Sequence, residues 1–308
     1  MAERFWVVLS QVATLFMLMG VGYALAKVSK ISPAGTREMS GLLMAVAIPC
    51  AIINGFPKEW DLGTLGMLGM AAVAVAVSYL LGVLVTLPLF RKEGSSLRAP
   101  LRFGSMYGNV GFMGLPLVAA VVGQEALVFV SITIIVCNVF AFTHGAMLMG
   151  GREAVSVKKI LLNPAIVGSF IGFALFLLRV ELPGPVQSTV NHIANLNTPL
   201  AMMVIGAQMS RADLLRTFRE SKLYLAAAVK LLAMPLLTAA VLLPLGLDRT
   251  CYLTLVILAG TPAAGLTSMF AEQYDRDTAR AAQLVSFSHL LSALTLPVMA
   301  VLAETLAG

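Results

Sequence analysis

The chain has 308 residues, of which 59% are hydrophobic and only 12% are charged. Soluble domains carry about 25% charged residues, so the composition excludes an ordinary soluble enzyme or binding domain and indicates a membrane protein. The net charge of +6 does not indicate nucleic-acid binding, because the basic residues are separated by hydrophobic segments and form no single patch.

A helix needs roughly 20 apolar residues to cross the hydrocarbon, and ten segments of the chain meet this requirement. The first segment is too long for the apolar part of a signal peptide and has no basic stretch before it, so we expect a retained helix. All ten are apolar on every face, which is typical of helices and not of membrane β-barrel strands. The ten segments cover residues 5–27, 36–56, 63–90, 99–121, 125–149, 159–179, 186–209, 221–246, 250–271 and 277–305.

Most of the 21 Lys and Arg residues fall in alternate loops, at 27–37, 91–102, 152–159, 211–222 and 276–280. Positively charged loops stay in the cytoplasm, so we expect these five loops inside and both termini outside. An even number of spans agrees with this topology.

The chain divides at the basic loop into residues 1–150 and 151–308, each with five predicted spans. Pro49 and Pro199 occupy matching second spans, while Asn109 and Thr261 occupy matching fourth spans. Because five is an odd number, the two halves must enter the membrane from opposite sides, which predicts an inverted repeat.

The sequence GNVGFMGLP, residues 108–116, interrupts the fourth span with residues that disfavour a helix. An interior proline costs a helix about 3 kcal/mol, and non-helical backbone at membrane depth is tolerated only inside protein or beside a water-filled cavity. A second interruption, Gly260-Thr261-Pro262, lies in the ninth span. The alternative is that these residues only kink helices or allow close packing; two interruptions in register favour a binding site.

Free amides at broken helices carry partial positive charge and attract a carboxylate. The candidate substrate-binding residues are Asn109, Val110, Gly111, Gly114, Pro116, Thr261, Pro262 and Ala263.

Lys230 is the one charged residue deep in a predicted span. Such residues are functional candidates, but the ammonium could also extend along the helix to the nearby loop or hold carbonyl groups freed by Pro235. These alternatives stay open from the sequence.

Three further polar residues lie in the fifth spans of the two halves. His144 and His289 are either hydrogen-bonded packing residues, which is the commoner case, or proton relays. We expect His289 to support the site. Asn138 is a candidate for the cavity wall, although hydrogen bonding between helices is the commoner role of a membrane Asn.

No enzymatic motif is present: there is no HExxH, GxSxG or P-loop sequence. Cys50, Cys137 and Cys251 are widely spaced, which favours neither a disulfide framework nor a zinc site. We therefore expect no catalytic residues, no metal and no cofactor.

The sequence resembles the auxin efflux carrier family, whose bacterial members are often described as malonate or malate transporters. The resemblance covers nearly the whole chain and depends on AIPCAII, GNVGFMGLPL, LNPAIVGSFIG, NTPLAMMVIGAQM, AAAVKLLAMP and AGTPAAGLTSMFAEQYDRD in that order. It implies ten helices in two inverted halves, with helices 1, 2, 6 and 7 as a scaffold and helices 3–5 and 8–10 as a transport domain. Helices 4 and 9 would cross, and the family's characteristic residues fall on Asn109, Pro116, Lys230 and Pro262.

The chain departs from the plant members of that family in three places. Ala263 replaces a Gln after the ninth-span proline, residues 66–80 of the third span lack the acidic and basic pair, and the long loop between spans 5 and 6 is missing. A mechanism based on that charged pair is therefore not expected here.

These observations predict a secondary transporter in the bacterial inner membrane that moves a small organic anion, a mono- or dicarboxylate, by alternating access. The resemblance also implies a possible homodimer. One alternative is a sodium-coupled symporter of the bile-acid type, which shares the inverted-repeat architecture. An alternative from another class is an intramembrane enzyme or assembly scaffold.

Overall fold

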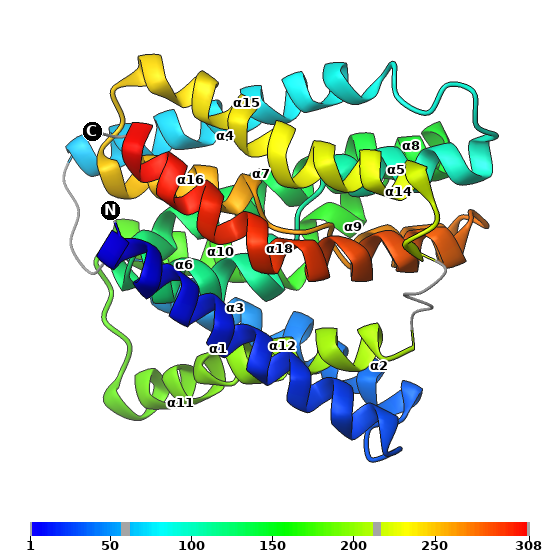
Figure 1. The fold of residues 1–308 in the computed structure, drawn as a ribbon. Coiled ribbons are helices and arrows are strands. Elements are labelled where there is room, and N and C mark those ends of the chain that lie inside the picture. The colour runs from blue at the N-terminus through cyan, green and yellow to red at the C-terminus, as the bar shows by residue number, and fades with distance from the viewer. Residues whose placement is uncertain (1, 57–61, 212–216, 307–308) are drawn as a thin grey trace.

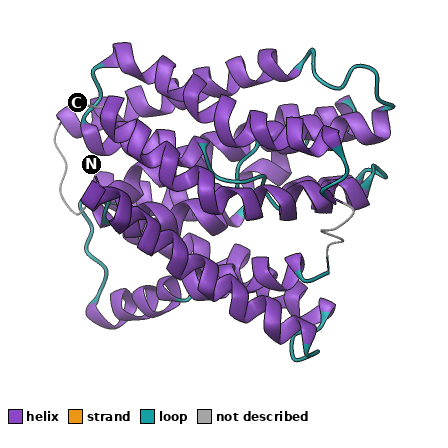
Figure 2. Ribbon diagram, viewed as in Figure 1, coloured by secondary structure: helices purple, strands orange, loops and turns teal. Residues whose placement is uncertain are grey.

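A computed structural model describes residues 2–56, 62–211 and 217–306, and every regular element in these ranges is helical (Figures 1 and 2). The first half of the chain contains α1 (Ala2–Lys27), α2 (Pro33–Leu42), α3 (Ile48–Gly55), α4 (Leu62–Thr86), α5 (Ser95–Met106), α6 (Leu115–Val121), α7 (Leu127–Phe140) and α8 (Ala146–Gly150). The second half contains α9 (Val157–Leu161), α10 (Pro164–Leu178), α11 (Gly184–Asn195), α12 (Asn197–Met209), α14 (Ser221–Ala228), α15 (Met234–Leu242), α16 (Arg249–Ala259), α17 (Leu266–Gln273) and α18 (Thr278–Leu306).

Several of these helices are long and apolar enough to cross a membrane. Among the described residues there are six such stretches, or seven if α9 and α10, bent by 40°, form one span with the residues before them. The other three expected spans are divided into α5 and α6, α11 and α12, and α16 and α17. The prediction of an all-helical integral membrane protein is therefore confirmed, whereas a count of ten spans requires each divided segment to cross once.

Short polar residues fix where several helices begin. The Asn163 side chain accepts hydrogen bonds from the Ala165 and Ile166 amides at the start of α10, where Pro164 occupies the first turn. Asp248 accepts from the Cys251 amide at the start of α16 in the same way. These caps satisfy backbone donors that a helix start otherwise leaves unpaired.

Proline positions coincide with wide helical turns. Residues 43–47, 110–114 and 229–233 form π-helical turns, and Pro49, Pro116 and Pro235 each follow two residues after the turn ends. A proline ring clashes with the carbonyl of the preceding turn, and a π turn widens the helix at that place. The prolines therefore bend these spans without ending them.

The helices form two groups that face each other. The first group, α1, α2, α3, α10, α11 and α12, is joined by packing of α1 on α12 and of α3 on both α10 and α11. The second group, α4 to α8 and α14 to α18, is joined by packing of α4 on α7 and α15, and of α18 on α5, α14, α16 and α17. In Figure 1, α1, α2, α11 and α12 lie below most of the second group.

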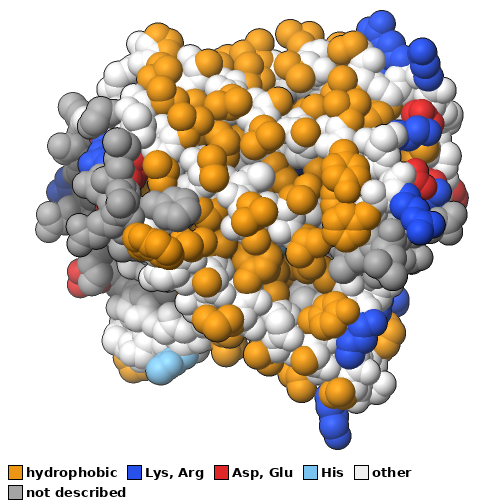
Figure 3. Space-filling model, in the orientation of Figure 1, with side chains coloured by type: hydrophobic (Ala, Val, Ile, Leu, Met, Phe, Trp, Pro, Cys, Tyr) orange, Lys and Arg blue, Asp and Glu red, His pale blue; other side chains and the backbone are white. Residues whose placement is uncertain are grey.

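The surface agrees with a membrane setting. Figure 3 shows apolar side chains over the middle of this face, with Lys and Arg gathered along its right-hand edge. Among the described basic residues next to the loops, Lys222 bonds Glu93 at 2.7 Å. Charge is thus concentrated where the helices leave the apolar zone.

Replacing Gly206 with Ala should destabilise the first helix group. A Cβ there would lie 1.9 Å from the Met19 carbonyl oxygen of α1, and a Cβ at Gly22 would lie 2.1 Å from the Met203 oxygen. Since backbone cannot yield as a side chain does, we expect a loss of roughly 1–3 kcal/mol, measured as a lower melting temperature in detergent. Gly20→Ala is the control, because nothing lies within 4 Å of its Cβ position; equal melting temperatures for the two variants would contradict the packing.

Candidate functional site

Two non-helical linkers meet at the centre of the second helix group. The first, residues 107–109, follows α5, and the second, residues 260–265, joins α16 to α17. They pair as an isolated antiparallel bridge between Gly108 and Ala263. The Asn109 amide donates to the Pro262 oxygen at 2.7 Å, and the Ala264 amide donates to the Tyr107 oxygen at 2.9 Å.

The pairing satisfies backbone groups that two broken helices would otherwise leave exposed in an apolar environment. Gly108 allows the linkers to come so close. A Cβ at this position would lie 2.4 Å from the Thr261 hydroxyl oxygen and 3.0 Å from the Lys230 Cε and Nζ atoms. We call the paired segments 107–109 and 260–265 the crossover.

Helix α18 holds both linkers of the crossover. The Ser288 hydroxyl accepts from the Ala263 amide at 3.0 Å. One residue later, His289 Nε2 lies 3.2 Å from Asn109 Nδ2, while its Nδ1 lies 2.7 Å from the Val285 oxygen. Because a carbonyl can only accept, Nδ1 carries the proton and Nε2 accepts from Asn109. This imidazole is therefore neutral.

Asn109 is held at both ends of its amide. Its Nδ2 donates to His289, and its Oδ1 accepts from the Phe112 amide at 3.2 Å, which caps the helix that resumes at Val110. The second histidine contacts the same linker. His144, in the turn 141–145 between α7 and α8, has its Nδ1 atom 2.9 Å from the Tyr107 hydroxyl. That hydroxyl donates to the Phe140 oxygen at 3.0 Å, so His144 is the donor.

A cavity of about 400 Å³ lies against the crossover, between the two helix groups. The first group contributes residues of α2, α3 and α12 and the start of α10, including Ser40, Ile48 and Gln208. The second group contributes the first linker, α7, α17 and α18. Of the residues predicted from sequence, those that line it are Asn109, Val110, Gly111, Asn138 and His289.

Several residues that line the cavity have backbone amides without an acceptor in the described parts of the chain, and those beside the crossover include Gly111, Gly265 and Leu266. Gly111 is in the first turn after the first linker, Gly265 is the N-cap of α17, and Leu266 is the first residue of α17. Such amides carry the partial positive charge of a helix start, about half an elementary charge for a full helix. The two broken helices therefore present donors to the same space.

The cavity extends from the crossover toward the basic loops. Arg211, at the end of α12, and Glu272, in the last turn of α17, line its outer part together with Thr278 at the start of α18. Arg211 is anchored to the first group by bonds to the Thr36 hydroxyl and the Ile31 oxygen, both at 3.0 Å. The opening thus lies on the side where Lys and Arg are concentrated.

The remaining predicted site residues lie behind the cavity wall. The Thr261 hydroxyl donates to the Leu258 oxygen at 2.7 Å and caps the end of α16. Ala263 is fully buried in an apolar cluster with Leu101 and Leu284. Gly114, Pro116 and Pro262 do not line the cavity, and a Cβ at Gly114 would lie 2.6 Å from Leu258. These residues shape the crossover from behind.

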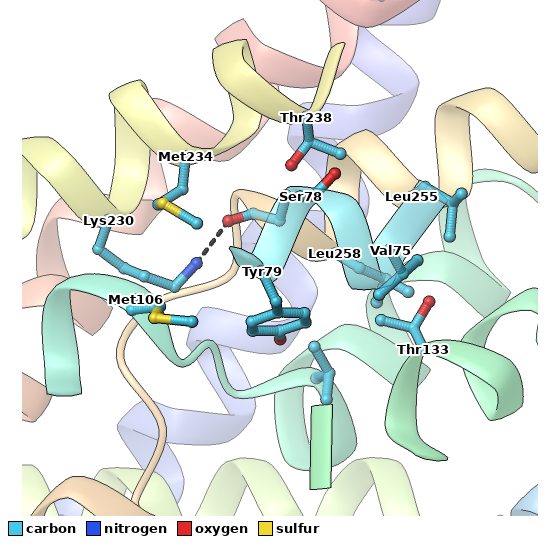
Figure 4. A pocket seen from close by; sticks show the side chains of 12 residues that line it. Val75, Ser78, Tyr79, Met106, Thr133, Lys230, Met234, Thr238, Leu255 and Leu258 are labelled. Atoms are coloured by element: carbon cyan, nitrogen blue, oxygen red, sulfur yellow. Dashed lines mark hydrogen bonds between the residues drawn. The ribbon is translucent and has the colours of Figure 1, made fainter. Parts of the chain in front are cut away.

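Lys230 connects its helix to the second linker. Its ammonium donates to the Ala259 oxygen at the end of α16, and its side chain is 1% exposed. In Figure 4 the side chain points from its helix toward that carbonyl, beside a small cavity of about 30 Å³ that Ser78 and Tyr79 also line. The ammonium therefore does not extend to the loop; it neutralises the negative end of a broken helix.

Several cavity residues were not predicted from sequence. Phe112, Gln208, Gly265, Leu266 and Glu272 belong to the quoted motifs, so their neighbours could have indicated them. Arg211 and Ser40 lie outside those motifs and reach the cavity only through folding. Within the described ranges, no three His, Cys, Asp or Glu side chains gather as a metal ion would require.

Fold and site together describe a multi-helix membrane protein with a pocket between two helix groups, the class of membrane transporters. A family described as "Membrane transport protein" matches residues 7–158 and 153–300. The chain belongs to this family.

The relatives agree with the predicted resemblance to auxin efflux carriers, which is confirmed. A "Putative malonate transporter" of Rhizobium meliloti is 25% identical over 296 residues, 92% of either chain. An uncharacterized transporter of Methanothermobacter thermautotrophicus is 23% identical over 94% of this chain and 96% of its own. Auxin efflux carrier component 3a of rice, Oryza sativa subsp. japonica, is 24% identical over 44% of this chain and 22% of its own.

Replacing Gly108 with Ala should disrupt the crossover. The added methyl would lie 2.4 Å from the Thr261 hydroxyl oxygen, so either that hydroxyl must give up its bond to Leu258 or the paired linkers must separate. We expect a loss of roughly 1–3 kcal/mol, seen as a lower melting temperature. Gly265→Ala is the matched control in the other linker, since nothing lies within 4 Å of its Cβ. An unchanged Gly108→Ala protein would show that the linkers are not in this contact.

Replacing Lys230 with Met should leave the Ala259 carbonyl buried without a donor. An unsatisfied buried group costs about 1–3 kcal/mol, so we expect a clear drop in melting temperature. Lys222→Met is the control, because the exposed bond from Lys222 to Glu93 contributes only about 0–1 kcal/mol. A larger drop for the Lys222 variant would contradict the assigned role.

Proposed function

We propose that this protein is a secondary carrier for a small organic anion, a mono- or dicarboxylate such as malonate. The single observation that supports this most is the cavity of about 400 Å³ at which two broken helices present unpaired amides. A carboxylate has the charge and the acceptor geometry for such donors. The name of the Rhizobium relative supports malonate as the first anion to test.

The proposal includes ten crossings in two inverted halves, divided at residues 150 and 151. Each divided segment, α5 with α6, α11 with α12 and α16 with α17, then counts as one crossing. The positions of the crossover linkers in the fourth and ninth segments support this arrangement, because paired interruptions in inverted repeats form the binding sites of many carriers. The basic loops would then face the cytoplasm of a bacterium, and both termini would lie outside.

Transport follows if the second helix group moves against the first. Both groups line the cavity, so a displacement between them changes the access to the crossover. In the present conformation the cavity extends toward the basic loops. Movement of the second group, with the crossover and its bound anion, would open the site to the opposite side while the first group stays fixed as the scaffold.

Lys230 argues against coupling to sodium at the second linker. A sodium site there needs several oxygen ligands, and the ammonium already occupies the Ala259 carbonyl. The ammonium thus takes a carbonyl oxygen that a sodium site at this linker could otherwise use, and we propose transport that is independent of sodium.

The proposal is tested by uptake of radiolabelled malonate into proteoliposomes, with Asn109→Ala as the key variant. Losing the amide removes the bond to His289 and the cap on Phe112, so we expect uptake to fall about tenfold or more, equivalent to roughly 1.4 kcal/mol. Asn109→Ser keeps an oxygen that can cap the helix start but lacks the amide that bonds His289. A folded Asn109→Ser protein with low uptake would therefore show that the site, and not the fold, is lost.

Asn191→Ala is the matched control, because Asn191 bonds Gln187 on α11 and does not line the cavity. Uptake should be equal with sodium and with choline buffers. Wild-type vesicles that move no short carboxylate from a panel of mono- and dicarboxylates would overturn the carrier proposal; uptake that is unaffected by Asn109→Ala would overturn the site.

A further inference from the structure

We propose that His289 Nε2 is a proton-binding site and that this carrier moves a proton together with its anion. The inference rests on the proposed carrier function and names the coupling ion for that same site. It depends on the hydrogen bonds that His289 makes, on its place in the cavity wall and on what protonation would do to its neighbour Asn109.

The two ring nitrogens have different partners. Nδ1 donates to the Val285 oxygen of its own helix at 2.7 Å, so that proton is fixed in place. Nε2 accepts from Asn109 Nδ2 at 3.2 Å. The imidazole is therefore neutral, and its one available lone pair is directed at the crossover.

Protonation of Nε2 cannot leave this arrangement intact, because both Nε2 and Asn109 Nδ2 would then be donors. Rotating the Asn109 amide restores a hydrogen bond by turning Oδ1 toward the histidine. The same rotation takes Oδ1 away from the Phe112 amide, to which it is now bonded at 3.2 Å. Phe112 lines the cavity, so its amide joins those of Gly111, Gly265 and Leu266 as a donor for a carboxylate.

Proton binding and anion binding therefore support each other. The proton adds a positive charge beside the site and frees one more amide, while a bound carboxylate favours the protonated imidazole. By linkage, each ligand must raise the affinity for the other by the same factor. Only an N–H bond forms and breaks: the Nε2 lone pair takes a proton from hydronium in the solution on one side, leaving water, and gives it back to water on the other side of the membrane.

The other titratable groups near His289 are either in the outer part of the cavity or already bonded to other partners. The titratable groups that share its cavity are Tyr107, Cys137, Arg211 and Glu272, of which Arg211 and Glu272 lie in the outer part. On the elements packed against α18, Lys230 is bonded to the Ala259 oxygen.

The remaining charged groups on these elements belong to helix ends or loop contacts. Lys27 ends α1, Arg249 begins α16, Lys222 pairs with Glu93, and Arg102 bonds loop carbonyls of Leu87 and Leu89. Arg98 lies in the first turn of α5. None of these described groups offers a carboxylate to the imidazole.

His144 provides a natural comparison in the same protein. It contacts the same linker, through the Tyr107 hydroxyl, but as a donor, and it does not line the cavity. The two histidines thus hold neighbouring residues of the crossover, while only His289 combines an accepting nitrogen with a place in the cavity wall.

The test uses the purified full-length protein in proteoliposomes, with radiolabelled malonate as the probe and an internal fluorescent pH dye. For each variant, the measured quantity is the ratio of uptake with an imposed acid-outside gradient to uptake without one. We expect a ratio on the order of threefold or more for wild type and for His144→Gln. For His289→Gln, which presents a neutral side chain at every pH, the ratio should be near one.

Wild-type vesicles should also become more acidic inside as malonate enters, a readout that needs no variant. The apparent affinity for malonate should rise as the pH falls, because proton binding and anion binding support each other. Malonate itself changes its protonation with pH, and the pH dependence measured with His289→Gln gives the part of the effect that comes from malonate alone.

Three outcomes overturn the inference while leaving the carrier proposal intact: malonate uptake without internal acidification, a wild-type ratio near one, or a ratio in His289→Gln equal to that of wild type. If His289→Gln does not fold, as judged by gel filtration, the dye measurement on wild type alone decides. Failure of wild type to exchange malonate in any condition is the separate result that overturns the carrier proposal.

Discussion

The structure depends on the need to pair every backbone group that a broken helix leaves unpaired at membrane depth. The crossover meets this need with bonds between its own linkers, from Asn109 to Pro262 and from Ala264 to Tyr107. Where a partner is missing, a side chain supplies one: Ser288 accepts from Ala263, and Lys230 donates to Ala259. Beside the crossover, the described amides that stay unpaired, such as those of Gly111, Gly265 and Leu266, belong to residues that line the cavity, where water or an anion can reach them.

Hydropathy and the positions of Gly and Pro were enough to predict the helical membrane fold and the two places where helices are interrupted. Both signals are local, because apolar runs and proline act on their own segment. The partners of each interruption were not predictable, since Ser288 and His289 lie 25 and 180 positions from the residues they bond. Thr261 shows the same limit: its hydroxyl was expected at the substrate, but its own helix end uses it.

The prolines in these spans shape the helices. From the sequence alone, this structural role could not be distinguished from a role in a binding site. Pro49, Pro116 and Pro235 each follow a π turn, in the first group, at the crossover and beside Lys230 respectively. A π turn leaves a helix continuous but shifts the faces on either side of it. In the span of Lys230, that turn contains the lysine itself, and the ammonium reaches the end of α16 from it.

The two halves of the crossover resemble each other in backbone but differ in chemistry. The first linker carries Tyr107 and Asn109, whose side chains are bonded to His144 and His289. The second carries Pro262, Ala263 and Ala264, which contribute only backbone, and Ala263 is packed so tightly that it is fully buried. If an anion binds between them, the second half can attract its charge but has no side chain to orient it. Orientation, and any response to protons, must then come from the first linker and from the helix that holds it.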